Sequence, residues 1–207
     1  KVVLKYLTEV GSETALLTSP NSTLTTQTYT ASTEQPSTSS TSSKAFDGQL
    51  TGQDSNTWKS SVGTYSSGDY QGSEVTQGYS GEWIQVNMGN PTVTGISTKV
   101  KSVTIKPQQN TATSIIDTHP SNFKLFASND ASSWSEIASI TDLSRDTWYS
   151  SSFNNYTVTL SSPEQYQYWR LVVSKIVDGS QVSIGELDFN GSIVTNNAFT
   201  YTDSNKL

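Results

Sequence analysis

The chain has 207 residues, a net charge of −6 and a sequence pI near 4.7, and this acidity argues against a nucleic-acid-binding surface, which needs a basic stripe. It contains no cysteine, which excludes disulfides and thiolate metal sites, and no apolar run reaches the roughly 18 residues expected of a membrane-spanning helix. Charged residues make up only 14% of the chain, and its wealth of Ser, Thr, Tyr and Trp favours strands and turns over helices.

The chain begins with an expected N-terminal arm over residues 1–23, in which two apolar patches are separated by Gly11. The arm is predicted to form two short strands or one segment that docks on a neighbour. Residues 24–44 are rich in Thr and Ser, which is typical of a linker. Residues 24–33 alternate in polarity, however, so an exposed strand leading into the domain is the alternative.

Strong strand signals follow residue 82. In EWIQVNMG the apolar residues Ile84, Val86 and Met88 fall on one face of a strand. The same alternation recurs in segments 101–107, 122–128, 134–140, 155–162 and 168–176. Short strands separated by frequent turns predict an all-β fold, a two-sheet β-sandwich.

The last predicted strand changes parity. Val182 and Ile184 are even-numbered, whereas Leu187 and Phe189 are odd-numbered, so the apolar face switches at Gly185-Glu186. A β-bulge there would account for the switch and would redirect the Glu186 carboxylate.

Taken in order, several segments resemble the discoidin (factor V/VIII type C) domain, a group that includes galactose-binding-like carbohydrate-binding modules. They are AFDGQ and TWKS, SGEWIQVNMG, NFKLFASNDASSWSEI, and YWRLVVSKI followed by VSIGELDFNG. The resemblance implies a jelly-roll β-sandwich over 24–192, without catalytic activity and with ligand loops at one rim. Similar domains occur in structural proteins of large algal DNA viruses, whose SGEW-like and YWRLVV-like segments are close to those of this chain.

The stretch 45–57 offers the oxygen ligands that calcium prefers, namely the Asp47 and Asp54 carboxylates, the Thr57 hydroxyl and backbone carbonyls. The resemblance implies a structural Ca²⁺ in this loop, closed by a carboxylate of the final strand, at the position of Glu186. The alternative is a plain turn after Asp47 and a hydrogen-bonded acid at Glu186.

Catalysis is not expected from this sequence. The single histidine, His119, is accompanied by no nucleophile-elbow pattern, and acids such as Asp142 and Asp146 are scattered as solvated surface groups usually are. Trp58, next to the proposed calcium loop, is interpreted as a core anchor.

Ligand binding is expected in the rim loops, because a sugar site needs an aromatic surface and a few fixed polar groups. The loop 142–155 supplies Arg145, Trp148, Tyr149 and Asn154, although Trp148 could equally belong to the core. Two other long loops add Tyr70 and His119 as candidates.

These observations predict a non-catalytic glycan-binding or adhesion module on an extracellular or particle surface, with a surface glycan or glycoprotein as its partner. The alternative is a structural interaction protein, such as a minor capsid or virion surface component. In that case the arm 1–23 and a C-terminal tail over 193–207 would contact neighbouring subunits.

Overall fold

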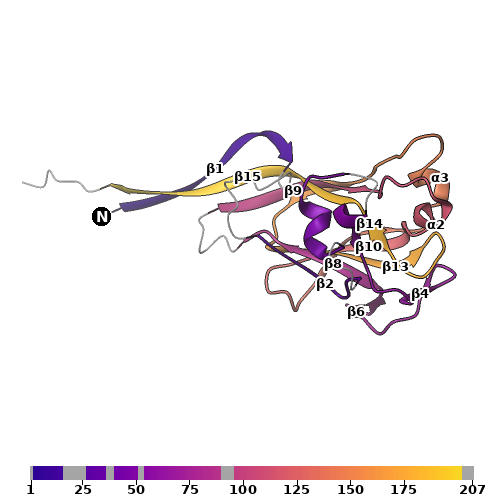
Figure 1. Cartoon of the computed structure of the whole chain (residues 1–207). Coiled ribbons are helices and arrows are strands. Elements are labelled where there is room, and N and C mark those ends of the chain that lie inside the picture. The colour runs from indigo at the N-terminus through magenta and orange to yellow at the C-terminus, as the bar shows by residue number, and fades with distance from the viewer. Residues whose placement is uncertain (1, 16–26, 36–39, 51–53, 90–95, 202–207) are drawn as a thin grey trace, which may run out of the picture.

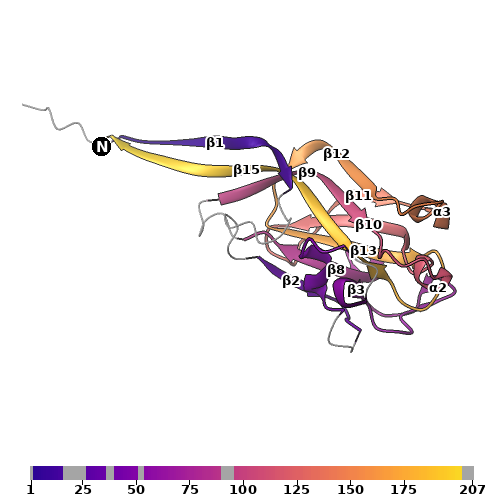
Figure 2. The same cartoon turned by 45° about the horizontal axis from the view of Figure 1, so that its top comes forward.

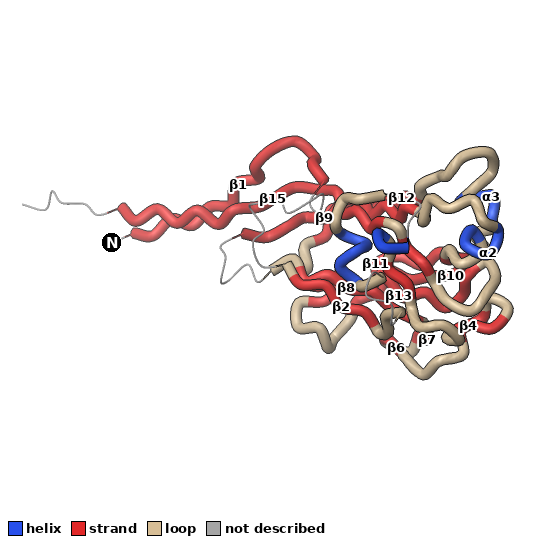
Figure 3. The backbone as a smooth tube through the Cα atoms, in the orientation of Figure 1, coloured by secondary structure: helices blue, strands red, loops and turns tan. Residues whose placement is uncertain are grey.

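The structure is a computed structural model that describes residues 2–15, 27–35, 40–50, 54–89 and 96–201. It is dominated by antiparallel strands, as Figure 3 shows, and this confirms the all-β prediction. The helical segments are one or two turns long: η1 (Ser42–Phe46), η2 (Asp54–Asn56), α2 (Thr113–Ile116) and α3 (Arg145–Trp148).

Two larger sheets form the layers of the sandwich (Figures 1 and 2). The first has the order β1 (Val2–Ala15), β15 (Glu186–Tyr201), β9 (Ile96–Lys106) and β12 (Tyr156–Glu164). The second has the order β11 (Ser135–Ile140), β10 (Pro120–Ser128), β13 (Tyr168–Ile176), β5 (Asp69–Tyr70) and β4 (Tyr65–Ser66). In the same sheet β8 (Glu82–Asn87) pairs with β13, and β2 (Thr28–Ala31) pairs with β8.

Two small strand pairs complete the body, β14 (Ser183–Ile184) with β3 (Trp58–Lys59) and β6 (Val75–Thr76) with β7 (Tyr79–Ser80). Trp58 is fully buried, and its indole N–H donates to the Thr33 carbonyl at 3.2 Å. The interpretation of Trp58 as a core anchor is therefore confirmed.

The core lies between the two sheets and contains the predicted apolar faces. Ile84, Val86 and Met88 are buried while the residues between them are half-exposed, as the alternation in β8 predicts. The facing strands contribute Val103, Ile105, Phe123, Leu125, Trp169, Leu171, Leu187 and Phe189, all buried.

The parity change at Gly185 marks a change of partner strand. Ile184 pairs with Trp58 of β3, whereas Glu186 begins β15 and pairs with Lys106 of β9. A Cβ at Gly185 would lie 2.6 Å from the Pro107 carbonyl oxygen, so only glycine fits where the chain crosses. The predicted redirection of Glu186 is thus achieved by crossing between sheets, in place of a bulge inside one strand.

The far part of β15 leaves the sandwich together with β1. Pairing of β15 with β9 ends at Thr195, whereas pairing with β1 continues to the Val2–Tyr201 pair. The resulting two-stranded ribbon, Val2–Leu7 paired with Asn196–Tyr201, projects from the body in both views (Figures 1 and 2). β1 is one long strand with a register shift between Val10 and Thr14, where two short strands were an expectation. β15 runs without a break through residue 192, where the C-terminal tail was expected to begin.

Three of the sequence segments that carry the family resemblance meet on the outer side of the second sheet. The Arg170 guanidinium lies 4.0 Å from the Trp83 ring centroid and 4.1 Å from that of Trp134. It also donates to Gln85 Oε1 and Thr76 Oγ1. Burial between the rings lowers the pKa of Arg170 to about 10, which leaves it charged at neutral pH.

A candidate binding pocket at the sandwich rim

The end of the sandwich opposite the ribbon carries α2, α3 and their loops (Figures 1 and 2). Two loops, 117–119 and 177–183, are fastened to each other there by backbone hydrogen bonds. Asp178 N–H donates to Asp117 O, Val177 N–H to His119 O, and Ser183 N–H to Thr118 O, at 2.8–3.0 Å. Regular hydrogen bonding of this kind holds the loops as a fixed surface.

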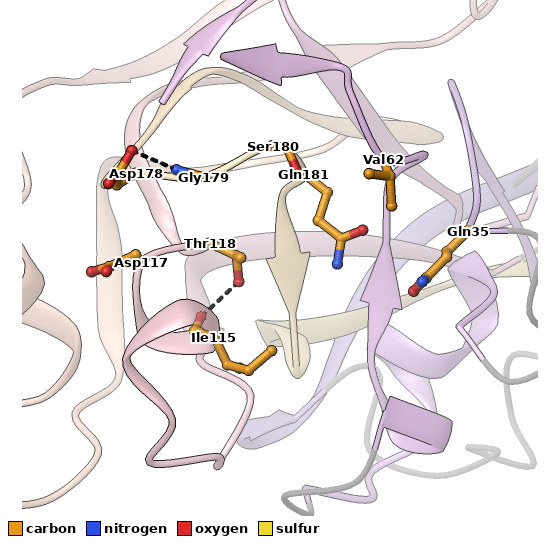
Figure 4. Close-up of a pocket in the computed structure, with 9 residues that line it drawn as sticks. All are labelled: Gln35, Val62, Ile115, Asp117, Thr118, Asp178, Gly179, Ser180 and Gln181. Atoms are coloured by element: carbon orange, nitrogen blue, oxygen red, sulfur yellow. Dashed lines mark hydrogen bonds between the residues drawn. The ribbon is translucent and has the colours of Figure 1, made fainter. Parts of the chain in front are cut away.

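This fixed surface forms a pocket of about 440 Å³, which we call the rim pocket. It is lined by Gln35, Val62, Ile115, Asp117, Thr118, Asp178, Gly179, Ser180 and Gln181. Figure 4 shows Gln181 between the Thr118 side and the side formed by Val62 and Gln35. Its size falls within the range typical of small-molecule sites.

Two acceptor atoms at the rim pocket have no hydrogen-bond partner among the described residues. They are Asp117 Oδ1 and Gln181 Oε1, and both are buried. Buried polar atoms are almost always paired in folded proteins, so two unpaired acceptors on residues that line one pocket are unusual. The other carboxylate oxygen of Asp117 accepts from Arg145, which approaches from α3.

The lining combines these polar residues with two apolar side chains, Val62 and Ile115. Val62 is 64% exposed, which is high for a large hydrophobic residue. Thr118 is already committed, because its hydroxyl donates to Ile115 O at 2.7 Å and contacts Ser183 Oγ. The pocket therefore combines polar side chains with a small apolar surface, an arrangement suited to a ligand with several hydroxyl groups.

Two of the residues expected to contact a ligand lie in the core. Trp148 is fully buried, and its indole N–H donates to Pro120 O at 2.9 Å. His119 is 1% exposed, and its Nε2 accepts from the Gln108 backbone N–H at 3.0 Å. This corrects the expectation for both, because side chains that support the loops from below do not reach a ligand at the surface.

The other predicted ligand residues are spread over the same end of the molecule. Arg145 is connected to the rim pocket only through its ion pair with Asp117 and is not part of the lining. Tyr149 packs against Phe153 with ring centroids 4.9 Å apart, and the Asn154 N–H donates to the Trp148 carbonyl. Tyr70 lies in β5, and its hydroxyl accepts from the Glu74 N–H; neither Tyr149, Asn154 nor Tyr70 lines the pocket.

The predicted fastening of the 45–57 stretch to the final strand is present. The backbone N–H of Gln49 donates to Asp47 Oδ1 at 3.0 Å and to Glu186 Oε1 at 2.9 Å. Asp47 also pairs with Lys44 at 3.1 Å. Burial, with hydrogen bonding to Asp47 and the nearby charge of Asp188, raises the pKa of Glu186 to about 8.

The residues at this place fit a hard cation in part. Glu186 Oε2 is buried and has no partner among the described residues, and a second carboxylate lies beside it. Within the described ranges, however, no group of three or more His, Cys, Asp or Glu side chains could hold a metal ion. Calcium would therefore need backbone carbonyls in addition. Thr57 is buried, and the side chain of Asp54 lies outside the described residues.

Sequence reasoning missed most of the rim pocket. Asp117 and Thr118 flank the histidine that attracted attention, but Gln35, Val62 and Gln181 lie in separate, unremarkable segments. The one signal in the sequence was the polar run before residue 119. The residues that line the pocket are Asp117 and Thr118 of this run, and the histidine itself is buried.

No known family profile matches the sequence, and no curated protein matches it either. The fold, in contrast, has many counterparts among solved structures. The family 32 carbohydrate-binding module of Clostridium perfringens NanJ, solved in complex with galactose, is 21% identical with a TM-score of 0.58. That comparison covers 86% of this chain and 99% of the module.

Two further neighbours are similar. A chitosan-binding module from a Paenibacillus sp. IK-5 chitosanase/glucanase has a TM-score of 0.55 at 18% identity, covering 86% of this chain and 99% of that module. A family 32 module from a C. perfringens family 31 glycoside hydrolase has a TM-score of 0.56 at 16% identity, covering 78% and 87%. The chain thus shares the β-sandwich fold of these carbohydrate-binding modules, the last two of which come from enzymes. Among the described residues, no helix is long and apolar enough to cross a membrane.

Proposed function

We propose that this protein is a non-catalytic glycan-binding module and that the rim pocket is its sugar site. The observation that carries the proposal is the pair of unpaired acceptors, Asp117 Oδ1 and Gln181 Oε1, at a pocket on the loop-bearing end of this fold. Sugar hydroxyls are donors, and an acceptor that gains a donor on binding recovers the free energy it lost on burial. The fold supports the proposal, since solved neighbours are modules that bind galactose or chitosan.

The charge of the pocket narrows the class of sugar. Asp117 is neutralised by Arg145, whereas Asp178 adds a further carboxylate at the exposed edge. In a protein of net charge −6 this arrangement disfavours sulfated, sialylated or uronic glycans, because like charges repel. Neutral or amino sugars are the ligands that the pocket accepts.

A glycan array probed with the full chain, with and without Ca²⁺, tests this function. The expected result is binding confined to neutral or amino-sugar glycans. For an adhesion module we propose an extracellular or particle surface as its location. An array without signal in either condition would contradict the function. Binding to acidic glycans alone would contradict the pocket.

We also propose that Ca²⁺ binds where Asp47 and Glu186 meet, with a structural role. The buried, unpaired Glu186 Oε2 supports this, and Asp47, Asp54, Thr57 and backbone carbonyls of the 45–57 stretch are the further ligands we expect. Bound Ca²⁺ would replace the proton that Glu186 holds at neutral pH and would tie the stretch to β15.

A second candidate function is favoured by the ribbon. A ribbon of this length outside a compact sandwich is a means of contacting neighbours, so we propose a structural component of a particle surface, such as a minor capsid protein, as the alternative. The two functions are compatible in an attachment protein. Co-sedimentation with assembled particles distinguishes this role from glycan binding. A variant in which the charge of Lys5 in the ribbon is reversed should co-sediment less than the native chain if the ribbon makes the contact.

A further inference from the structure

The ribbon has an open edge. β1 pairs with β15 on one side, and no strand among the described residues pairs with its other side. An edge strand of this length presents a row of backbone N–H and C=O groups without partners in the sheet. A two-stranded ribbon is also marginally stable when nothing else supports it. Both facts make this open edge of β1 a suitable place for a further strand to pair.

We infer that this strand is β1 of a second copy of the same chain. The two β1 strands would run antiparallel about a two-fold axis at Leu7, joining the two first sheets into one continuous sheet. Such an interface is isologous, because each copy uses the same surface patch. The pairing does not depend on the proposed sugar binding.

The sequence of β1 is self-complementary about Leu7. An axis at that residue places Lys5 opposite Glu9 of the second copy, and Glu9 opposite its Lys5. It also places Leu4 opposite Val10. In this register each charged residue is therefore directly opposite a residue of the opposite sign, and Leu7 is opposite itself.

Neighbouring registers lack this match. An axis at Tyr6 would place Glu9 opposite Val3, and an axis at Thr8 would place it opposite Leu7. Lys5 would then be opposite Leu7 or Gly11, so in either register neither charge would meet an opposite charge. The charge pattern therefore favours the register with its axis at Leu7, just as opposed charges specify the partner in other protein interfaces.

The pairing has a geometric consequence for ligand binding. The ribbon leaves one end of the body, and α2, which contributes Ile115 to the rim pocket, lies at the other end (Figures 1 and 2). Two copies joined through β1 would keep both pockets free. If the proposed function holds, a dimer would bind a multivalent glycan surface more tightly than one copy does.

Charge reversal tests the register. The full chain is sedimented at equilibrium over a range of concentrations at low salt, where the native protein is expected to dimerise. Glu9→Lys should weaken the dimer at least tenfold, because it opposes two lysines. The double variant Lys5→Glu/Glu9→Lys should restore it. Asp146→Lys, an exposed site on α3, changes the net charge equally and should have no effect.

Cysteine cross-linking supplies an independent readout, since the chain has no cysteine of its own. Leu7→Cys would lie opposite itself across the axis, within the Cα separation that a disulfide requires. Mild oxidation should convert it to a covalent dimer. Val75→Cys, at a site 54% exposed in the body, should stay monomeric. A native protein that is monomeric at every concentration, or a dimer that Glu9→Lys leaves unchanged, would overturn the proposal.

Discussion

Asp47 and Glu186 accept hydrogen bonds from the same donor, the backbone N–H of Gln49. One acid lies in the loop after η1 and the other at the start of β15, so this shared donor joins a loop to the core sheet. The second oxygen of Glu186 remains buried and unpaired among the described residues. We therefore expect this place to respond to protons and to the proposed Ca²⁺.

Calcium should raise the melting temperature of the native chain relative to the same protein in chelator. At a concentration one hundred times the dissociation constant, mass action stabilises the folded state by about 2.7 kcal/mol. Glu186→Gln keeps the shape of the side chain but removes its charge, so the calcium response should be greatly reduced. Differential scanning calorimetry measures both, and identical melting in calcium and chelator would contradict the proposed site.

Without calcium, Glu186 should make the protein less stable as the pH rises. Its pKa is about 8 in the folded state and near 4.5 when unfolded, so the folded state binds more protons between these values. Its contribution to the free energy of unfolding is fully present below about pH 4.5 and is lost as the pH rises through 8. Denaturant unfolding in chelator should show a fall of a few kcal/mol across this window. A flat profile, or one that Glu186→Gln does not flatten, would count against it.

His119 should produce the opposite slope at lower pH. Burial lowers its pKa from 6.5 to about 4 in the folded state, so the unfolded state binds more protons between these values. Stability should therefore fall by roughly 3 kcal/mol as the pH drops from 6.5 through 4. His119→Gln, which cannot ionise, should be less stable at neutral pH but should lack this slope. Persistence of the slope in that variant would assign it to other groups.

The Arg170 stack should contribute to stability through its planar shape. Arg170→Lys keeps the charge but cannot lie flat between Trp83 and Trp134, nor donate in the same way to Gln85. We expect a loss of about 1–2 kcal/mol and a change in tryptophan fluorescence. Lys175→Arg, in the same strand, serves as the control. Unaltered unfolding and emission in Arg170→Lys would show that the stack is incidental.

Most of the fold could be predicted from the alternation of apolar and polar side chains along the strands. Period-two patterns in β8 and β10 predicted which residues face the core, because a strand buried on one face leaves that signature locally. The parity change before Glu186 correctly indicated a redirected carboxylate, although its cause is a crossing between sheets. Such features are local in sequence, which is why they could be read without coordinates.

The site was less predictable because it is made by contacts between distant segments. Polar neighbours made Trp148 and His119 look like surface residues, yet both are buried beneath the loops they support. Asp117 and Gln181 become neighbours only because two loops hydrogen-bond along their length. No sequence pattern records that pairing, and unpaired acceptors are visible only once the partners of every other polar group are known.

The most direct test of the central claim is a calorimetric titration of a glycan found on the array into the native protein and three variants. Asp117→Asn and Gln181→Ala alter the rim pocket, whereas Asp142→Asn makes the same chemical change at an exposed residue outside its lining. We predict a loss of affinity of about tenfold or more for each pocket variant, equivalent to 1.4 kcal/mol, with Asp142→Asn unchanged. Equal affinities in all four correctly folded proteins would contradict a sugar site in the rim pocket.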